Sequence, residues 1–181
     1  EDGEMVKIID REFGREAAVD AIDKAFILGA TYLSRKGYTL SLQDLNVSEN
    51  VKKMTDEVIV DSEKRTSEIV QQYEEGTLVP IPGKSLEETR ETKILQVLNE
   101  VRTEIAKIVK ANFPITGNVT KMIQPEAAGS MLNITQIGCC VGQQALGNKR
   151  INFGFTDRTL PFFKKGDLSP ESRGFIKSSY F

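Results

Sequence analysis

Apolar residues recur at helical spacing over the first part of the chain and predict two helices there. The first covers residues 4–12 and the second covers 15–35, and each is followed by a glycine that stops it. Residues 38–42 alternate between apolar and polar and predict a short strand. A polar connection over 44–50 is expected to cap the next helix.

The segment 50–75 has a narrow apolar stripe on an otherwise charged helix, interrupted at Ser62 and Arg65. Such a stripe suits one arm of a two-helix hairpin better than a helix in a globular core. Residues 76–83, which contain prolines and glycines, are predicted to connect the two arms. The stripe consists of Val51, Met54, Val58, Ile69 and Tyr73.

The second arm is predicted to begin at a capping box. The hydroxyl of Ser85 accepts the amide of Glu88, whose carboxylate reaches back to the start of the helix. A clean helical stripe follows and ends near Phe113. The charges on both arms are interpreted as solvated surface. The stripe consists of Ile94, Val97, Leu98, Val101, Ile105, Ile108 and Val109.

From residue 117 charges become sparse while glycines and amides increase, which predicts a boundary between a scaffold and a functional part. Residues 130–146 are predicted to form one helix with Ser130 near its N-cap and Gly147 at its end. Glycines at 138 and 142 would let another backbone approach. The amides on one face suit a polar channel wall or a backbone partner, or they satisfy buried loop carbonyls. That face holds Asn133, Gln136, Cys140, Gln143 and Gln144.

Residues 149–155 are expected to form a loop and then a strand, and Ser169 with Pro170 marks a helix start. Basic and aromatic residues interleave over 158–165, a composition that can contact nucleic acid, but a role inside the fold is favoured. A carboxylate metal site is disfavoured because its candidates lack a recognised ligand spacing. Those candidates are Asp157, Asp167 and Glu171.

Composition removes several classes of function. The net charge of −2 and the lack of a basic block argue against a strong sequence-independent grip on nucleic acid. Histidine is absent, so the commonest general base and zinc ligand are missing. The adjacent Cys139 and Cys140 are not expected to form a disulfide, and a reduced, intracellular setting fits. Neither a membrane span of ~20 apolar residues nor a signal peptide is expected.

The predicted fold is therefore mostly α, with a projecting antiparallel two-helix hairpin and a smaller helical or irregular region that holds a few short strands. Three parts are expected: 1–48 as connecting helices, 49–117 as the hairpin, and 118–181 as the amide-bearing segment.

Several motifs between residues 129 and 180 occur together in the order found in one family. They are GSMLNITQ (129–136), VGQQ (141–144), KRI (149–151), GFTDRTLP (154–161) and GDLSPESRGF (166–175). On these motifs the chain resembles the largest subunit of multisubunit DNA-directed RNA polymerases, with details closer to the archaeal type. Upstream, residues 98–102 resemble the second funnel helix, and 37–44 resemble the end of the pore region, which precedes the hairpin and would include residues 1–48.

The resemblance implies a piece of the funnel, which surrounds the secondary channel. In the family enzyme, nucleotides enter there, backtracked RNA leaves there, and cleavage factors insert there. That enzyme is a nucleotidyltransferase that uses two magnesium ions, held by an aspartate loop expected outside this stretch, as are the bridge helix and trigger loop. No cofactor is therefore expected in this chain, and the isolated chain is expected to be inactive.

The resemblance also implies site residues. Asn133, Gln136, Gln143 and Gln144 would line the channel near the nucleotide. The two adjacent glutamines match a pair that contacts a channel-blocking fungal toxin in the eukaryotic enzyme. Ala145 replaces the usual serine of that enzyme, so toxin sensitivity is not carried over.

Two positions depart from the family. Ala128 stands where a basic residue normally approaches the triphosphate, a loss that would weaken the contact by about 1–3 kcal/mol. Phe162 stands where histidine is usual and predicts a repacked apolar contact.

The partners implied are the remainder of the largest subunit, the other polymerase subunits and above all the second-largest, with DNA, RNA and nucleoside triphosphates in the full complex. A transcript cleavage factor is a further partner, and no membrane is expected. The setting would be the cytoplasm of an archaeon, or the nucleus in a eukaryotic cell. The alternative function is a protein-interaction module, in which the hairpin over 50–112 docks a cleavage factor or an inhibitor.

Overall fold

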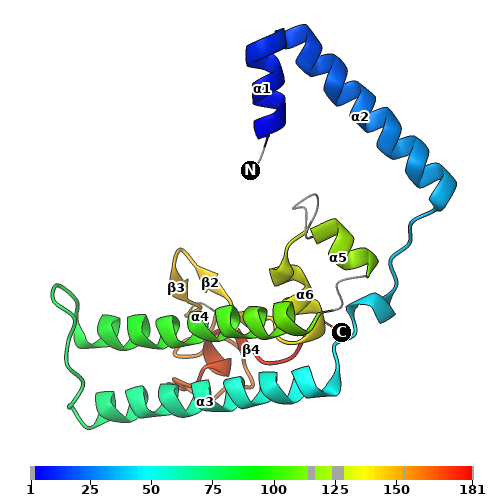
Figure 1. Cartoon of the computed structure of the whole chain (residues 1–181). Coiled ribbons are helices and arrows are strands. Elements are labelled where there is room, and N and C mark those ends of the chain that lie inside the picture. Colours follow the sequence, from blue (N-terminus) through cyan, green and yellow to red (C-terminus); the bar gives the residue numbers. More distant parts are fainter. Residues whose placement is uncertain (1–2, 114–116, 124–128, 153, 181) are drawn as a thin grey trace. The chain divides into compact units, whose positions relative to one another are not determined.

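The structure is a computed structural model that describes residues 3–113, 117–123, 129–152 and 154–180. It divides into two compact units, Glu1–Leu40 and Ser41–Phe181 (Figure 1). Helices dominate both units and the strands are short, so the predicted fold class is confirmed.

The first unit consists of α1 (Glu4–Phe13) and α2 (Arg15–Lys36), as predicted. The glycines that follow the two helices have positive φ values of 88° and 73°, which lets the chain leave each helix without strain. Ala18 is the only buried residue among those described in this unit. The two helices therefore hold almost no core of their own.

The predicted strand over 38–42 is wrong. Residues Leu42–Leu45 instead form a 3-10 turn, η1. The turn is favoured locally because the backbone N–H of Ser41 donates to a carboxylate oxygen of Asp44 at 2.8 Å, and the serine hydroxyl contacts the same oxygen. An alternating segment forms a strand only where a second strand pairs with it, and the described residues provide none here.

Helices α3 (Glu49–Glu74) and α4 (Leu86–Asn112) form the hairpin of the second unit and lie side by side (Figure 1). The predicted stripe on α4 is confirmed, with Ile94 and Leu98 fully buried. The stripe on α3 differs from its prediction, because Met54 is partly exposed whereas Ser62 is buried.

Small hydroxyl residues continue the buried stripe of α3. Ser62 donates to the carbonyl of Ile59 at 2.6 Å, and Thr66 donates to the carbonyl of Ser62 at 2.8 Å. Their hydroxyls are satisfied within their own helix, so these short side chains can face α4 without leaving a buried donor unpaired. The apparent interruption in the sequence is therefore part of the helix–helix contact.

The connection between the arms and the start of α4 follow the prediction. Gly76 and Gly83 have positive φ values of 72° and 82°. The capping box is confirmed: the N–H of Glu88 donates to the Ser85 hydroxyl at 3.1 Å, and the N–H of Ser85 donates to the Glu88 carboxylate at 3.0 Å.

The rest of the unit packs along the hairpin through short elements. They are α5 (Asn118–Ile123), α6 (Met131–Gly138), β1 (Gly142–Gln143), β2 (Ala145–Leu146), β3 (Lys149–Arg150), η2 (Glu171–Arg173) and β4 (Phe175–Ile176). Strand β1 pairs with β4, and β2 pairs with β3, both antiparallel. Because α6, β1 and β3 all contact α4, this helix organises the unit (Figure 1).

The predicted single helix over 130–146 is wrong. It ends at Gly138, and the chain turns through Cys139 into β1. The following residues leave the helix for two reasons: β1 gains a partner strand from residues far along the chain, and Gly147 with Asn148 forms the tight turn of the β2–β3 hairpin. Both turn residues have φ of 58°, the combination that two-residue hairpin loops require.

The expectation of a loop followed by a strand over 149–155 is also wrong in order, since β3 comes first. The helix start at Ser169 and Pro170 leads only to the short turn η2. The close approach expected at Gly138 is confirmed, because a side chain there would meet the carbonyl oxygen of Leu45 at 2.9 Å.

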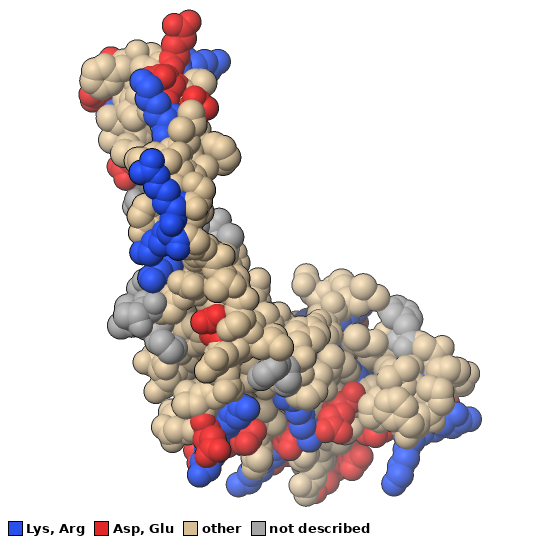
Figure 2. Space-filling model, turned by 90° about the vertical axis from the view of Figure 1, so that its right-hand side faces the viewer, with Lys and Arg blue, Asp and Glu red and all other residues tan. Residues whose placement is uncertain are grey.

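Charged side chains of both signs are interspersed over the lower part of the face shown in Figure 2. In the described ranges, no helix has the combination of length and apolar content that crossing a membrane requires.

Candidate functional site

The four amide residues singled out from the sequence do not share one helix face. Asn133 and Gln136 lie on α6, whereas Gln143 belongs to β1 and Gln144 follows it. Asn133 is exposed and accepts a hydrogen bond from the Ser130 hydroxyl at 3.0 Å. Gln136 is half-buried and donates from Nε2 to the carbonyl of Val141 at 3.3 Å, which ties the end of α6 to the start of β1.

Gln143 is a buried structural residue with 4 % of its surface exposed. Its Nε2 donates to the carbonyls of Gln144 at 2.6 Å and Arg173 at 2.9 Å. These contacts match the second sequence interpretation, in which the amides satisfy buried carbonyls. The Oε1 atom is buried and has no hydrogen-bond partner within the described residues.

Gln144 is half-buried, and its backbone N–H donates to the carbonyl of Gly174 at 2.8 Å. The structure thus brings Gln136, Gln143 and Gln144 together around the β1–β4 pair, while Asn133 lies on the exposed side of α6. Ala128, the position of the expected phosphate contact, lies outside the described residues.

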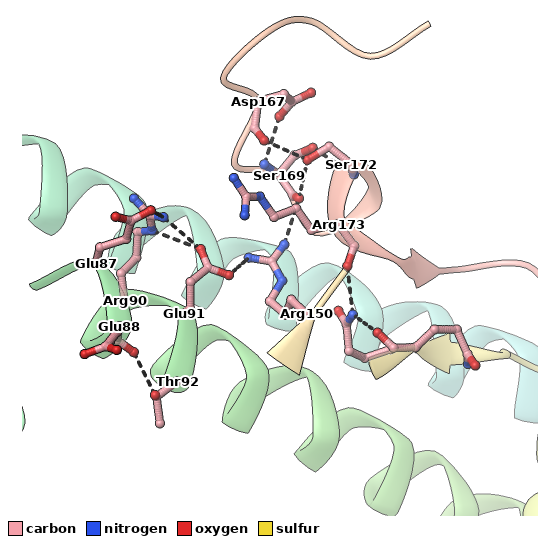
Figure 3. Close-up of polar contacts among 12 residues, drawn as sticks. Glu87, Glu88, Arg90, Glu91, Thr92, Arg150, Asp167, Ser169, Ser172 and Arg173 are labelled. Carbon is pink, nitrogen blue, oxygen red and sulfur yellow. Dashed lines mark hydrogen bonds and ion pairs between the residues drawn. The ribbon is translucent and has the colours of Figure 1, made fainter. Parts of the chain in front are cut away.

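A buried charge cluster that the sequence did not reveal joins the hairpin to this region. Arg150 on β3 has a side chain only 1 % exposed, and its guanidinium lies 3.4 Å from the carboxylate of Glu91 on α4. It also donates to the carbonyl of Ser169 at 2.9 Å, so Arg150 lies between the helix and the C-terminal segment (Figure 3).

Arg90 completes this cluster from the other side of Glu91. It donates to the Glu91 carboxylate at 2.9 and 3.1 Å, lies 3.6 Å from Glu87, and stacks over the ring of Tyr73 at 4.3 Å. The cluster therefore links both arms of the hairpin to β3. We call Arg90, Glu91 and Arg150 the arginine–glutamate junction.

Burial dominates the electrostatics of the junction. Desolvation lowers the pKa of Arg150 to about 10, against the attraction of Glu91, while Arg173 and Arg90 add to the lowering. Its Nε is buried and has no partner among the described residues. The available sequence signal was the two-residue turn at 147–148, which sets Lys149 outward and Arg150 inward on a paired strand.

Lys177 forms a second link between the C-terminal segment and the hairpin. It pairs with Glu63 on α3 and with Glu171 at 2.5 Å. Hydrogen bonds to both carboxylates raise the pKa of this lysine. Ion pairs thus join both helices of the hairpin to later segments of the chain: Glu91 on α4 pairs with Arg150, and Glu63 on α3 pairs with Lys177.

The cysteines and carboxylates were candidates for reactive or metal-binding groups. Cys139 and Cys140 are free thiols, as expected, and burial raises the pKa of Cys140 to about 11. A thiol with such a pKa is protonated at neutral pH and is a poor nucleophile. Across the described ranges, no group of three or more cysteines, aspartates or glutamates converges on a point that could hold a metal ion.

Phe162 is 75 % exposed. The apolar contact expected there is formed with its neighbour in the sequence, Phe163, and the two ring centroids lie 4.4 Å apart. Arg158 supports the turn beneath them by donating to the carbonyls of Pro161 at 2.9 Å and Phe163 at 3.4 Å. Of the basic and aromatic cluster, Arg158 therefore has a role inside the fold and Phe162 does not.

Comparisons with known proteins give a consistent result. A sequence model of the family described as RNA polymerase Rpb1, domain 4, matches residues 70–176. DNA-directed RNA polymerase subunit Rpo1N of Methanothermobacter thermautotrophicus (strain Delta H) is 41% identical over 98% of this chain and 21% of that protein. The same subunit of Thermococcus celer is 36% identical over 99% of the chain and 20% of its own length. That of Halococcus morrhuae is 35% identical over 98% of the chain and 51% of its own length. The chain thus spans about a fifth of the first two relatives and half of the third.

Proposed function

Because the chain belongs to the family of RNA polymerase Rpb1, domain 4, we propose that it serves transcription as part of a polymerase largest subunit and borders the secondary channel. The observation that carries this proposal is the family match over 70–176, which runs from the end of α3 through α4 to β4. Within this range the arginine–glutamate junction joins α4 to β3 and to the end of α3.

The distribution of polar groups supports a channel wall. Asn133 is exposed, and Gln136 and Gln144 are half-buried, so all three leave polar surface open to solvent. Amides donate and accept hydrogen bonds without a net charge, so they offer weak, reversible contacts to a passing nucleotide. Gln143 contributes differently, because its side chain fixes the backbone on which Gln144 lies.

The chemistry of nucleotide transfer is assigned to other parts of the polymerase. In the family enzyme magnesium ions are bound elsewhere, and this chain would contribute shape and polarity to the passage. We expect the purified chain to be folded and helical but to incorporate no nucleotide on a primed template with magnesium. Measurable templated synthesis by the chain alone would contradict this assignment.

A chimeric polymerase tests the channel role. The matching segment of the Methanothermobacter subunit, to which this chain is 41% identical, would be replaced by this chain. N133E and Q144E are expected to raise the KM for nucleoside triphosphates, more at low salt, because a negative charge in a passage repels a polyanion. T77E at the hairpin connection is the matched control. Equal effects of all three variants would contradict a wall formed by the amides.

A second candidate function is docking of a transcript cleavage factor or an inhibitor on the hairpin. The observation that favours it is the exposed connection between the arms, where Val79 is 73 % exposed. Glu68 and Glu74 on α3 are also exposed. Charge reversal there is expected to weaken binding of a cleavage factor to the polymerase, measured by titration at two salt concentrations. Unchanged affinity in several such variants would argue against docking.

The partners follow from the same proposal. The remainder of the largest subunit, the second-largest subunit, DNA, RNA and nucleoside triphosphates would surround this chain in the full complex. Exposed apolar residues on α2, such as Phe26 at 74 % and Leu28 at 72 %, support packing against further protein. The archaeal relatives support a cytoplasmic setting.

A further inference from the structure

A groove runs between the C-terminal half of α3 and the loop over 162–170. Its helix wall is formed by Thr66, Ser67, Val70, Gln71 and Glu74, and its other wall is the loop itself. None of the four amide residues of the candidate site lines this groove. We call it the α3 groove.

The loop wall is fixed by hydrogen bonds although it has no regular secondary structure. The N–H of Gly166 donates to the carbonyl of Asp157 at 2.8 Å. The hydroxyl of Ser172 donates to the carbonyls of Asp167 and Ser169, both at 2.9 Å, and the Asp167 carboxylate accepts the N–H of Ser169 at 2.8 Å (Figure 3). A wall held in this way loses little conformational freedom when a partner binds.

The groove presents groups that are unused within the fold. Phe162 is 75 % exposed at its edge. Lys164 and Lys165 are exposed on the same loop, and in the ranges that the structure describes neither makes an ion pair. An exposed aromatic ring can anchor a partner's apolar side chain, and two cations beside it can attract carboxylates of the same partner.

The charge arrangement favours a peptide over a nucleic acid. Glu74 on the helix wall and Asp167 on the loop line the same groove as the two lysines. A polyanion with evenly spaced phosphates would meet both carboxylates. A peptide segment can match the pattern, with carboxylates toward the lysines and a basic residue toward Glu74.

We propose that the α3 groove docks a protein segment that carries carboxylates beside an apolar side chain, with a basic residue close to them in its sequence. The carboxylates pair with Lys164 and Lys165, and the apolar side chain packs against Phe162 and Val70. The inference rests on the docking function of the hairpin proposed above and assigns to it a site and a chemistry.

The test uses the full chain and fluorescence anisotropy. The probe is a labelled peptide with two adjacent glutamates, a leucine and a lysine one turn away, and a second peptide has glutamine in place of both glutamates. The first peptide is expected to bind and the second to bind at least about tenfold more weakly. F162A and the double variant K164E/K165E are each expected to raise the Kd of the first peptide by about tenfold or more.

Matched controls lie outside the groove. Phe155 is a second exposed aromatic residue and Lys149 a second exposed lysine, so F155A and K149E are expected to leave the Kd unchanged within about twofold. Thermal unfolding followed by circular dichroism shows whether each variant is folded, and the exposure of the substituted residues predicts that all are.

Three results would overturn the proposal. They are no binding of either peptide, equal effects of groove and control variants, or tighter binding of a twelve-nucleotide oligo(U) RNA that competes with the peptide. Charge reversal at Glu68, which lies outside the groove, tests the broader docking function separately. If that reversal weakens binding of a cleavage factor while neither peptide binds the groove, the docking function of the hairpin is supported and only the assignment to the α3 groove is wrong.

Discussion

Single polar side chains that are buried or half-buried join segments of this chain that are distant in sequence. Glu91 lies between two arginines, and its carboxylate is the shared partner of Arg90 and Arg150. Gln143 similarly fixes two carbonyls from different segments. In each case one side chain forms the hydrogen bonds that its partners would form with water in the unfolded chain. Its removal therefore leaves those partners buried and unpaired.

Removal of the Glu91 carboxylate is therefore expected to be costly. E91Q leaves Arg150 buried without its anionic partner and should lower the free energy of unfolding by about 2–4 kcal/mol, somewhat less than for a fully buried pair. Urea unfolding followed by circular dichroism measures the change. E100Q breaks the exposed Arg65–Glu100 pair and should cost under about 1 kcal/mol. Similar losses in both variants would refute a special role for the junction.

Acid is expected to weaken the start of α4 through its capping box. Hydrogen bonds from the backbone and side chain of Ser85 lower the pKa of Glu88 below 4.5 in the folded chain. The folded state then binds fewer protons than the unfolded state, so this stabilisation is present above pH 4.5 and is lost as pH falls through the folded pKa. After correction for the intrinsic pH dependence of exchange, the protection of the amides at residues 85–88 should decrease in that window. E88Q should remove this pH-dependent loss of protection, whereas E104Q, away from the cap, should not.

Elements of this fold are positioned by close contacts at glycine and by tight turns. Helix α6 ends against the loop before α3, where Gly138 leaves only enough room for a hydrogen. The β2–β3 turn delivers Arg150 to the junction two residues later. In both places the backbone geometry of one or two residues determines whether a contact with a distant segment can form.

Substitution of Gly138 tests the contact at the end of α6. In G138A the new methyl group would lie 2.9 Å from the carbonyl oxygen of Leu45, so we expect a loss of about 1–3 kcal/mol in thermal unfolding despite the higher helix propensity of alanine. G29A is the matched control on α2, because no atom lies within 4 Å of the added group. G29A should stabilise the helical state of α2 by up to about 1 kcal/mol. Stabilisation by both substitutions would contradict the close approach.

The turn at 147–148 can be tested at Asn148, which has φ of 58°. N148G should be tolerated, whereas N148V should destabilise the unit by about 1–2 kcal/mol, because a β-branched residue is strained in the left-handed region. Chemical shifts of the Arg150 side chain would report whether the strand still presents it to Glu91. A valine variant as stable as the wild type would mean that the turn does not constrain β3.

The two units of the whole molecule differ in how much core they possess. Of the buried apolar residues in the described ranges, only Ala18 belongs to Glu1–Leu40, and the rest lie in Ser41–Phe181. A helical pair without a core gains little from burial and is marginal in water. Large apolar residues on α2 remain exposed instead.

The difference predicts how pieces of the chain behave. A chain of residues 41–181 should unfold cooperatively at nearly the same temperature as the full chain, whereas residues 1–40 alone should show weak, non-cooperative helicity by circular dichroism. The full chain should also self-associate more strongly in sedimentation velocity, because of the exposed apolar residues on α2. A cooperative transition in residues 1–40 alone would refute this division.

Local signals in the sequence were sufficient for the long helices and their ends. The stripe through Ile94 and Val101, the capping box at Ser85 and the glycine after α2 depend on neighbours within a few residues, so they can be read without a structure. The family resemblance was likewise a property of ordered motifs, and the comparisons confirm it.

Tertiary structure alone decided the region after Gly138. Residues 139–146 carry a pattern compatible with a helix. In the structure β1 instead pairs with β4, more than thirty residues away, and this pairing satisfies backbone groups that a helix would otherwise satisfy locally. The burial of Gln143, the Arg150–Glu91 pair and the Ser62 contact likewise depend on segments distant in sequence. A sequence fixes what each residue can donate, accept or bury, whereas its partners are set only when remote segments pack against one another.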